Sequence, residues 1–393
     1  MNNEEHPFSE QAGWRESLLL LFSSSGVIRA VEGDTVRTFS NPVFKGADPW
    51  VYKTDSCYYY CFVYKKGLAV SKTKELHKKG QLVEVWKAPA EGWNRSCIWA
   101  PELHYVCGKW YIYYAAGESG PPYIHQRTGV LEAVSSDPQG AYIDKGMIYT
   151  GDNVDCWPDT DANRWAIDMT VFEWQKKLYA VWSGWENNES TDKTRQNLYI
   201  AEMENPWTIS TNRTLLSEPD QPWETDGRLD LNEGPQVLIN EDRLFIIYSC
   251  GQSWLPTYKL AQLKLKNPDN NLLDRDNWIK SGPVFTGNEE VYGVGHAGFT
   301  TSPDGTEHWI VYHTKVDRKP GWERHICLQR FIFDFDGSPY FGKAQPVTVR
   351  QPLPSVSGIN KRNNNSCFMV NLCFFTGKDI YLYLKLTKRV TNN

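Results

Sequence analysis

The sequence predicts an all-β fold, a five-bladed β-propeller, on two observations. A pattern of two short apolar strands around a polar turn occurs five times, at 50–64, 102–116, 170–184, 236–250 and 299–313. Helical periodicity, in contrast, is almost absent from the chain. A pair of generic β-sandwiches explains the pattern less well, because sandwiches do not require five near-equal copies.

The five copies are spaced widely enough for each to hold a full blade. Their second strands align at intervals of 52 to 68 residues, at Tyr59, Tyr111, Tyr179, Phe245 and Trp309. These intervals are somewhat longer than the usual propeller repeats, and one hairpin cannot fill them. Further strand-like segments follow the hairpins, for example at 198–203, 258–265 and 326–335. We therefore predict four short antiparallel strands in each unit.

The composition restricts the partners. The 393 residues are 40% apolar, which allows a substantial core, and the formal net charge is −5. This charge gives no reason to expect nucleic acid or an anionic membrane as a partner. No apolar run approaches the length of a transmembrane helix, and the nine cysteines show no zinc-ligand spacing.

Three segments are predicted along the chain. A propeller at 41–358 lies between an N-terminal extension at 1–40, which could pack on the propeller, and a C-terminal tail of unassigned structure at 359–393. The apolar run at 17–22 is short, and glutamates precede it. Because a secretory signal has a basic upstream region, we predict no signal peptide here.

Polar residues precede the aligned aromatic position at matched distances. The distance is 11 residues for Asp48 and Asp168, 12 for Glu233 and 13 for His296. The second copy has Trp99 there, 12 residues ahead. The innermost strand of each blade lines the central channel, so a residue just before that strand should lie at the channel mouth. We predict that these five side chains meet there.

A ring of three carboxylates indicates a site rather than a scaffold, because like charges repel each other and destabilise the fold. Taken singly, each of these segments also fits an ordinary turn. Glycoside hydrolysis needs one protonated acid at the leaving oxygen and one ionised carboxylate. The two groups must therefore have different surroundings, and a third carboxylate can raise the pKa of the acid. The rings of Trp50 and Trp99 could pack on a sugar.

Five motifs carry a family resemblance. They are "NPVFKGADPWV", "IWAPELHYVCGKWYIYYAA", "WAIDMTVF", "LNEGPQVL" and "YGVGHAGFTTSPDGTEHWIVYH". In this order, over about residues 41–355, they resemble the family 43 glycoside hydrolases, five-bladed propellers that attack arabinose- and xylose-containing polysaccharides. The segments "KLYAVWSGWE", "NPWTIS" and "PWET" are most similar to the branch of exo-acting α-L-arabinofuranosidases.

The resemblance implies an inverting mechanism and a role for each carboxylate. Asp48 would be the general base that activates water, and Glu233 would be the general acid. Asp168 would modulate the pKa of Glu233 and orient it. An inverting pair of carboxyl groups is typically separated by about 6.5–9.5 Å, which leaves room for a water molecule.

The resemblance also implies binding residues. Trp99 would border the sugar pocket, and Arg324 lies near the position of a pocket arginine. His296 lies where the family places a central histidine, near a channel water or a bound calcium ion. No cofactor is expected to be required, although a structural calcium in the channel, with His296 as a ligand, is compatible with the family.

Two departures from the family pattern bear on these expectations. The segment "GVGHAG" has Val294 and Ala297 where the family usually shows Pro and then Asn or Ser, which could alter the surroundings of His296 and weakens a metal assignment. Met169 follows Asp168, where Gly or Pro is more common, and it could change the shape of the pocket.

The expected function is release of terminal arabinose from arabinan or arabinoxylan oligosaccharides. A β-xylosidase or an endo-arabinanase has the same fold and acids, and a non-catalytic carbohydrate-binding propeller is the alternative outside the enzymes. The insert at 186–196 could wall off one side of the pocket, as exo action requires. We expect a monomer with a saccharide substrate, and such a substrate suggests an extracellular location.

Overall fold

A computed structural model describes residues 37–225 and 227–356 of the chain. The predicted C-terminal tail at 359–393 and the run at 17–22 lie outside the described residues, as does most of the extension at 1–40. Within the described part, no helix has the length and apolar character needed to cross a membrane. The helices seen there are the short 3₁₀ turns η1 (Val154–Cys156), η2 (Thr160–Ala162) and η3 (Arg275–Asn277).

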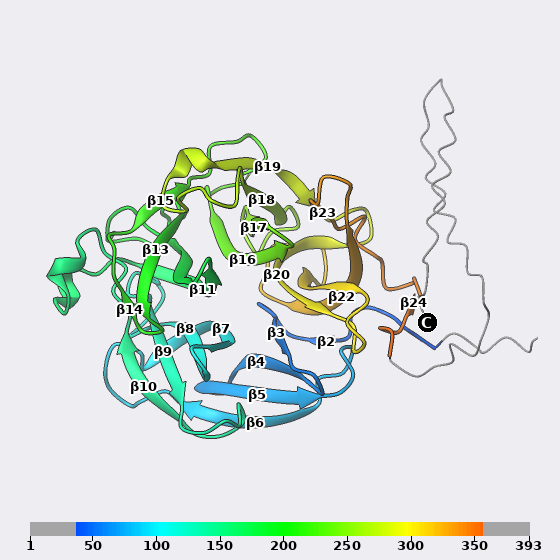
Figure 1. Cartoon of the computed structure of the whole chain (residues 1–393), viewed down its shortest axis with the longest axis horizontal. Helices are drawn as coiled ribbons and strands as arrows, with labels where there is room; N and C mark the ends of the chain where they lie inside the picture. The colour runs from blue at the N-terminus through cyan, green and yellow to red at the C-terminus, as the bar shows by residue number, and fades with distance from the viewer. Residues whose placement is uncertain (1–36, 226, 357–393) are drawn as a thin grey trace, which may run out of the picture. The chain divides into compact units, whose positions relative to one another are not determined.

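The first four blades are antiparallel sheets in chain order (Figure 1). Blade 1 is β3 (Trp50–Lys53), β4 (Tyr58–Tyr64), β5 (Gly67–Thr73) and β6 (Gln81–Lys87). Blade 2 is β7 (Ser96–Val106), β8 (Lys109–Gly117), β9 (Arg127–Ala133) and β10 (Tyr142–Met147). Blade 3 is β11 (Ala166–Trp174), β12 (Lys177–Gly184) and β13 (Asn197–Asn205), with β14 (Thr208–Ile209) and β15 (Thr214–Ser217) both paired to β13. Blade 4 is β16 (Asn232–Asn240), β17 (Arg243–Cys250), β18 (Lys259–Leu265) and β19 (Trp278–Phe285).

The fifth blade joins the two ends of the propeller. It is β20 (Tyr292–Thr301), β21 (His308–Lys315) and β22 (Arg324–Phe333), completed by β2 (Phe44–Lys45) from the start of the chain. Phe44 pairs with Ile326 and Lys45 with His325. The short strand β23 (Pro339–Tyr340) also pairs with β22, and β1 (Thr38–Phe39) pairs with β24 (Gln351–Pro352). This pairing of sequence-distant strands closes the ring and covers an edge of blade 5.

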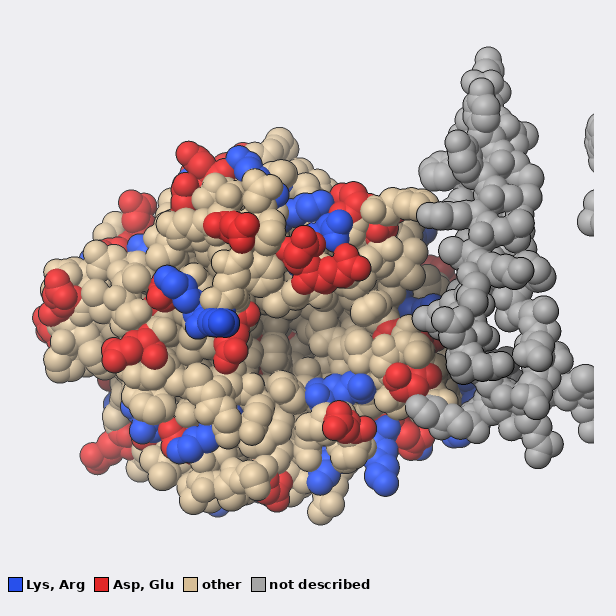
Figure 2. Space-filling model, viewed as in Figure 1, with Lys and Arg blue, Asp and Glu red and all other residues tan. Residues whose placement is uncertain are grey.

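The innermost strands form a closed circle. β3 contacts β7, β7 contacts β11, β11 contacts β16, β16 contacts β20, and β20 contacts β3. The predicted five-bladed propeller is therefore confirmed, and each of the five predicted hairpins forms the inner two strands of one blade. Figure 2 shows the face in view hollowed at the centre of the ring, with acidic and basic side chains intermingled around it.

The hairpin turns follow from backbone geometry. Only two residues join β7 to β8 and β11 to β12. Cys107 and Gly108 have φ values of 48° and 79°, and Gln175 and Lys176 have values of 48° and 67°. Two consecutive positive φ angles are the mark of the type I′ turn, whose twist matches that of the flanking strands.

Aromatic side chains fill the space between the blades. Trp182 and Tyr199 of blade 3 pack with Tyr113 of blade 2 in one core cluster, and Tyr60 of blade 1 packs with Trp309 of blade 5 in another. Most of the aromatic residues therefore stabilise the contacts between blades by burying large apolar surfaces. This leaves few rings available to a ligand.

Candidate active site

Irregular backbone at the start of the inner strands presents the predicted side chains to the channel. The strand register shifts between Ile167 and Thr170 around Asp168, and just after Glu233 in β16. Asp168 itself has a φ of 55°. A bulge of this kind re-aims a side chain that a regular strand would turn into a neighbouring blade.

One expectation about position needs correction. Asp48, with a φ of 47°, does lie just ahead of its inner strand. Trp99, Asp168, Glu233 and His296 lie inside their inner strands instead. The strands begin earlier than apolar periodicity indicates, because pairing with the second strand resumes on the far side of each bulge.

Asp48 is surrounded by basic groups. Its Oδ1 atom lies 3.0 Å from Nη1 of Arg324, 3.2 Å from Nδ1 of His313 and 3.5 Å from Nδ1 of His296. Burial alone would raise the pKa of Asp48, but the Arg324 guanidinium and the two imidazoles hold it well below its usual range. Asp48 is therefore an ionised carboxylate, and its side chain keeps 24% exposure through which water can reach it.

Glu233 has the opposite character. Its carboxyl is buried, with 8% exposure, and Tyr258 donates a hydrogen bond of 2.9 Å from its hydroxyl to Oε1. Burial raises the pKa of Glu233 to about 7, and the negative charge of Asp48 acts in the same direction. The hydrogen bonds from Tyr258 and Ser253 and the charge of Arg324 partly oppose this rise. Glu233 can therefore hold a proton at a pH where Asp48 is ionised.

Asp168 interacts with both of these acids. It is 4% exposed, and burial followed by the nearby charges of Glu233 and Asp48 raises its pKa well above the usual value. Its Oδ2 atom accepts a hydrogen bond of 3.0 Å from the backbone N–H of Gly234, the residue after Glu233. This bond ties the orientation of Asp168 to the backbone that carries Glu233.

Gly234 has a steric reason to be glycine. Its φ is +54°, and a Cβ atom built there would lie 3.1 Å from Nδ1 of His296. A larger residue would therefore be strained by its backbone and crowded by the imidazole. The motif "NEGP" accordingly brings the strand close against His296, whose backbone N–H is held by the Ser249 hydroxyl at 2.8 Å.

One side of the site has an aromatic wall. Trp99 is half-buried, and its ring meets that of Tyr123 edge-on at 4.9 Å between centroids. The backbone N–H of Tyr123 donates to Oδ2 of Asp192, at 3.1 Å, within the insert at 186–196. In the same insert, Asn188 accepts a hydrogen bond of 3.0 Å from the backbone N–H of Trp165. The insert is therefore fixed beside Trp99, where the expected pocket wall lies.

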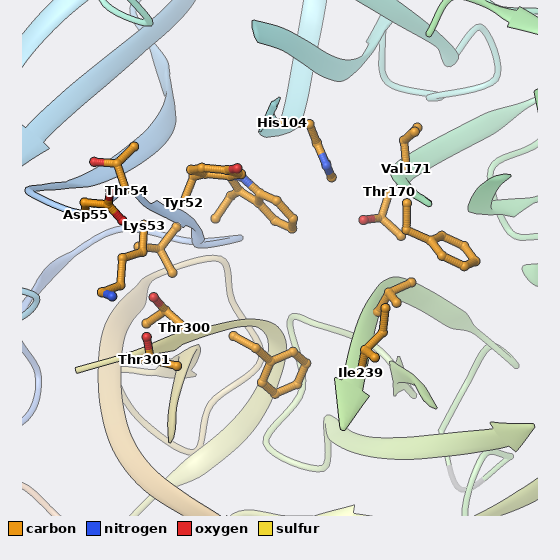
Figure 3. A pocket seen from close by; sticks show the side chains of 15 residues that line it. Tyr52, Lys53, Thr54, Asp55, His104, Thr170, Val171, Ile239, Thr300 and Thr301 are labelled. Atoms are coloured by element: carbon orange, nitrogen blue, oxygen red, sulfur yellow. The ribbon is translucent and has the colours of Figure 1, made fainter. Parts of the chain in front are cut away.

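Trp50 is placed differently from the expectation that it packs on the sugar. Its indole N–H donates to the Leu103 carbonyl at 2.6 Å, and its ring lies 4.4 Å from that of His104. It lines a cavity of about 500 Å³ at the other end of the channel, formed by the later residues of the inner strands (Figure 3). The hydrogen bond to blade 2, which sequence spacing does not reveal, holds the ring there.

Several residues of the site were not singled out from the sequence. His313, Tyr258 and Ser253 contact the carboxylates, but they lie on second and third strands or on loops. Glu102, considered only for its spacing, is 2% exposed and bonds through Oε2 to Nε2 of His104 at 2.8 Å. Burial raises its pKa well above the usual value. Only the first strands followed a detectable repeat, which explains the omissions.

The residues around His296 were tested as a calcium site. Calcium prefers six to eight oxygen ligands, whereas His296 has Asp48 as its charged neighbour. Over residues 37–225 and 227–356, no group of three or more His, Cys, Asp or Glu side chains could hold a metal ion. These side chains therefore do not form a protein cage for calcium, and the expected calcium remains a prediction.

The departures from the family pattern lie in the core. Val294 and Ala297 are buried in a core cluster that blades 4 and 5 share. Met169 is buried in the cluster between blades 2 and 3. These side chains fill space between blades, and they leave the contacts of His296 and Asp168 described above in place.

Comparisons with known proteins agree with this fold and site. The profile of glycosyl hydrolases family 43 matches residues 39–339. An extracellular exo-α-(1→5)-L-arabinofuranosidase of Streptomyces avermitilis is 33% identical over 321 residues, which are 78% of this chain and 63% of that protein. A protein of the same description from Streptomyces chartreusis is 31% identical over 328 residues, 80% of this chain and 94% of that protein.

A solved structure is similar as well. The crystal structure of an α-L-arabinofuranosidase from Lactobacillus brevis matches with a TM-score of 0.70 at 33% identity, over 79% of this chain and 98% of that chain. The chain spans less than two thirds of the length of the Streptomyces avermitilis relative.

Proposed function

The chain belongs to glycosyl hydrolase family 43 and is a glycosidase, and from this premise we propose that it is an inverting, exo-acting α-L-arabinofuranosidase. Its substrates would be arabinan or arabinoxylan oligosaccharides with terminal arabinose. The observation that carries the proposal is the contrast between an ionised Asp48 and a Glu233 whose pKa is raised to about 7. Glycoside hydrolysis needs one carboxyl group in each of these states.

In the proposed mechanism Asp48 is the general base. It accepts a proton from a water molecule as the water oxygen attacks the anomeric carbon of the arabinose. Arg324 keeps Asp48 ionised before the reaction, and its fixed charge holds the carboxylate in position. His313 and His296 support this arrangement from the channel side.

Glu233 is the proposed general acid. It gives its proton to the glycosidic oxygen as the bond to the anomeric carbon breaks, so that the leaving sugar departs as a neutral alcohol. Asp168 raises the pKa of Glu233 through its own charge when ionised, and its bond to the Gly234 N–H aligns the two groups. Neither step needs a group that these side chains do not supply.

The arabinose specificity is supported by the relatives, whose descriptions name α-L-arabinofuranosidases at 31–33% identity. Exo action is supported by the insert at 186–196, which hydrogen bonds hold against the Trp99 and Tyr123 wall. A wall on one side of the site favours a pocket that admits a chain end over an open groove.

The test compares substrates. Purified protein should hydrolyse an aryl α-L-arabinofuranoside at least tenfold faster than an aryl β-D-xyloside, and it should release only free arabinose from arabino-oligosaccharides at early times. Faster cleavage of the xyloside would indicate a β-xylosidase, and early release of short oligosaccharides would indicate an endo-arabinanase. Binding of these saccharides without hydrolysis would indicate a non-catalytic propeller.

A further inference from the structure

Two tryptophans lie together beside the candidate site, on loops from neighbouring blades. Trp254 is in the loop between β17 and β18, and Trp322 is in the loop between β21 and β22. Their ring centroids are 5.1 Å apart, with 46° between the ring planes. The two loops are also joined by a hydrogen bond of 2.9 Å from the Gly321 N–H to the Trp254 carbonyl.

Each tryptophan is connected to one of the proposed catalytic groups. Trp254 directly follows Ser253, whose side chain hydrogen bonds to the carboxyl of Glu233. The ring of Trp322 has the Arg324 guanidinium 5.7 Å from its centroid, and Arg324 binds Asp48. The aromatic pair is therefore attached to the loop that supports the proposed acid and to the arginine that supports the proposed base.

The pair is exposed although it is held in place. Trp322 is 62% exposed and Trp254 is half-buried. The loop of Trp322 is fixed from below, because Nζ of Lys315 donates to the Gly321 carbonyl at 2.6 Å. Two adjoining indoles on an anchored surface are unusual in a molecule that buries most of its aromatic rings between blades. Aromatic faces of this kind suit the apolar faces of sugar rings.

We propose that Trp254 and Trp322 form the binding surface for the leaving-group sugar, the pentose to which the terminal arabinose is attached. This inference rests on the proposed function. The leaving group is the part of the substrate that receives the proton from Glu233, and Trp254 lies beside the residue that hydrogen bonds to Glu233. The wall of Trp99 and Tyr123 belongs to blade 2 and its following loop and would serve the arabinose that is released.

The experiment uses two substrates that differ in the leaving group. Arabinobiose has a sugar there, whereas α-L-arabinofuranosyl fluoride has a leaving group without a ring. We expect Trp322→Ala and Trp254→Ala to raise KM for arabinobiose roughly tenfold, the effect of losing one aromatic contact. KM for the fluoride should change less than twofold, and so should inhibition by free arabinose.

Two further variants serve as controls. Trp322→Phe keeps an aromatic face and should recover most of the affinity for arabinobiose. Trp157→Ala removes another exposed tryptophan, at the end of η1, and should change neither KM. Thermal unfolding of each variant shows whether the protein remains folded, and the fluoride reaction reports on the catalytic groups in the same sample.

Two outcomes would overturn the inference. Equal losses with both substrates would mean that the tryptophans only support the ion pair between Arg324 and Asp48. Unchanged kinetics with arabinobiose would mean that they do not contact the leaving group. If the wild-type protein cleaves neither substrate, the proposed function itself has failed, and the inference that rests on it falls too.

Discussion

Arg324 and Asp48 form an ion pair, with Nη1 of the arginine 3.0 Å from Oδ1 of the aspartate, although 276 residues separate them in the chain. The pair forms because β22 of the last blade ends its loop beside the segment that precedes β3 of the first blade. It exists only when the ring is closed. The closure of the propeller thus sets the charge of the proposed base.

Loss of the Arg324 charge should shift the acidic limb of the pH profile. Arg324 lowers the pKa of Asp48, so in Arg324→Met that pKa rises and the ionised base persists only at higher pH. We expect the acidic limb of kcat/KM to move up by one pH unit or more. Arg324→Lys keeps the charge and should restore part of the shift, whereas an unmoved limb in Arg324→Met would show that Asp48 is not the titrating base.

Removal of the proposed acid should depend on the leaving group. Glu233→Gln cannot donate a proton, and general acid catalysis typically contributes about 10²- to 10⁴-fold. We expect a loss of this size in kcat for arabinobiose. The loss should be much smaller for an aryl arabinofuranoside with an activated leaving group, which needs little protonation. Equal losses on both substrates would argue against the acid role.

Tyr258 should tune the basic limb. Its hydroxyl hydrogen bonds to Glu233 and lowers the pKa of that carboxyl, which burial raises to about 7. In Tyr258→Phe the pKa should rise further, so the protonated acid would persist to higher pH. The basic limb of kcat/KM should move upward by up to about one pH unit. A downward shift would show that the hydroxyl does not stabilise the ionised form.

Asp168→Asn should stabilise the protein while impairing catalysis. The raised pKa of Asp168 means that the native state binds more protons than the unfolded state between about pH 4 and the raised value. Stability therefore falls as pH rises through this window. The variant should gain at least about 1.4 kcal/mol at pH 8, the equivalent of one pKa unit, and little at pH 4.

Unfolding of both proteins by urea at the two pH values measures this difference. The asparagine can still accept the hydrogen bond from the Gly234 N–H, so the local backbone should be preserved. A variant that is less stable than the wild type at pH 8 would show that the Asp168 charge is compensated in the native state. Its kcat should nevertheless fall, because the alignment and pKa of Glu233 depend on Asp168.

The stereochemical outcome should be inversion. Proton NMR of an α-L-arabinofuranoside digest, recorded within the first minutes, should show β-arabinose before mutarotation produces the α form. Initial α-arabinose would mean that a carboxylate attacks the sugar directly, and Asp48 would then have to act as a nucleophile rather than as a base.

The local signals in the sequence predicted the repeat units well. Each of the five hairpins combines apolar alternation with a polar turn, and strand pairing between neighbours in the chain follows from these signals alone. The order of the carboxylates came from the same repeat. The partners of those carboxylates carried no such signal, because Tyr258 and His313 lie on strands whose spacing varies from blade to blade.

The sequence by itself thus determined the fold class, the number of blades and the level at which Asp48, Asp168 and Glu233 enter the channel. Tertiary structure decided the rest, including the ion pair of Asp48 with Arg324 and the placement of the Trp50 ring against blade 2. The physical reason is that hairpins depend on residues close in the chain. The charge of a carboxylate and the facing of a ring depend instead on what other blades bring against them once the ring has closed.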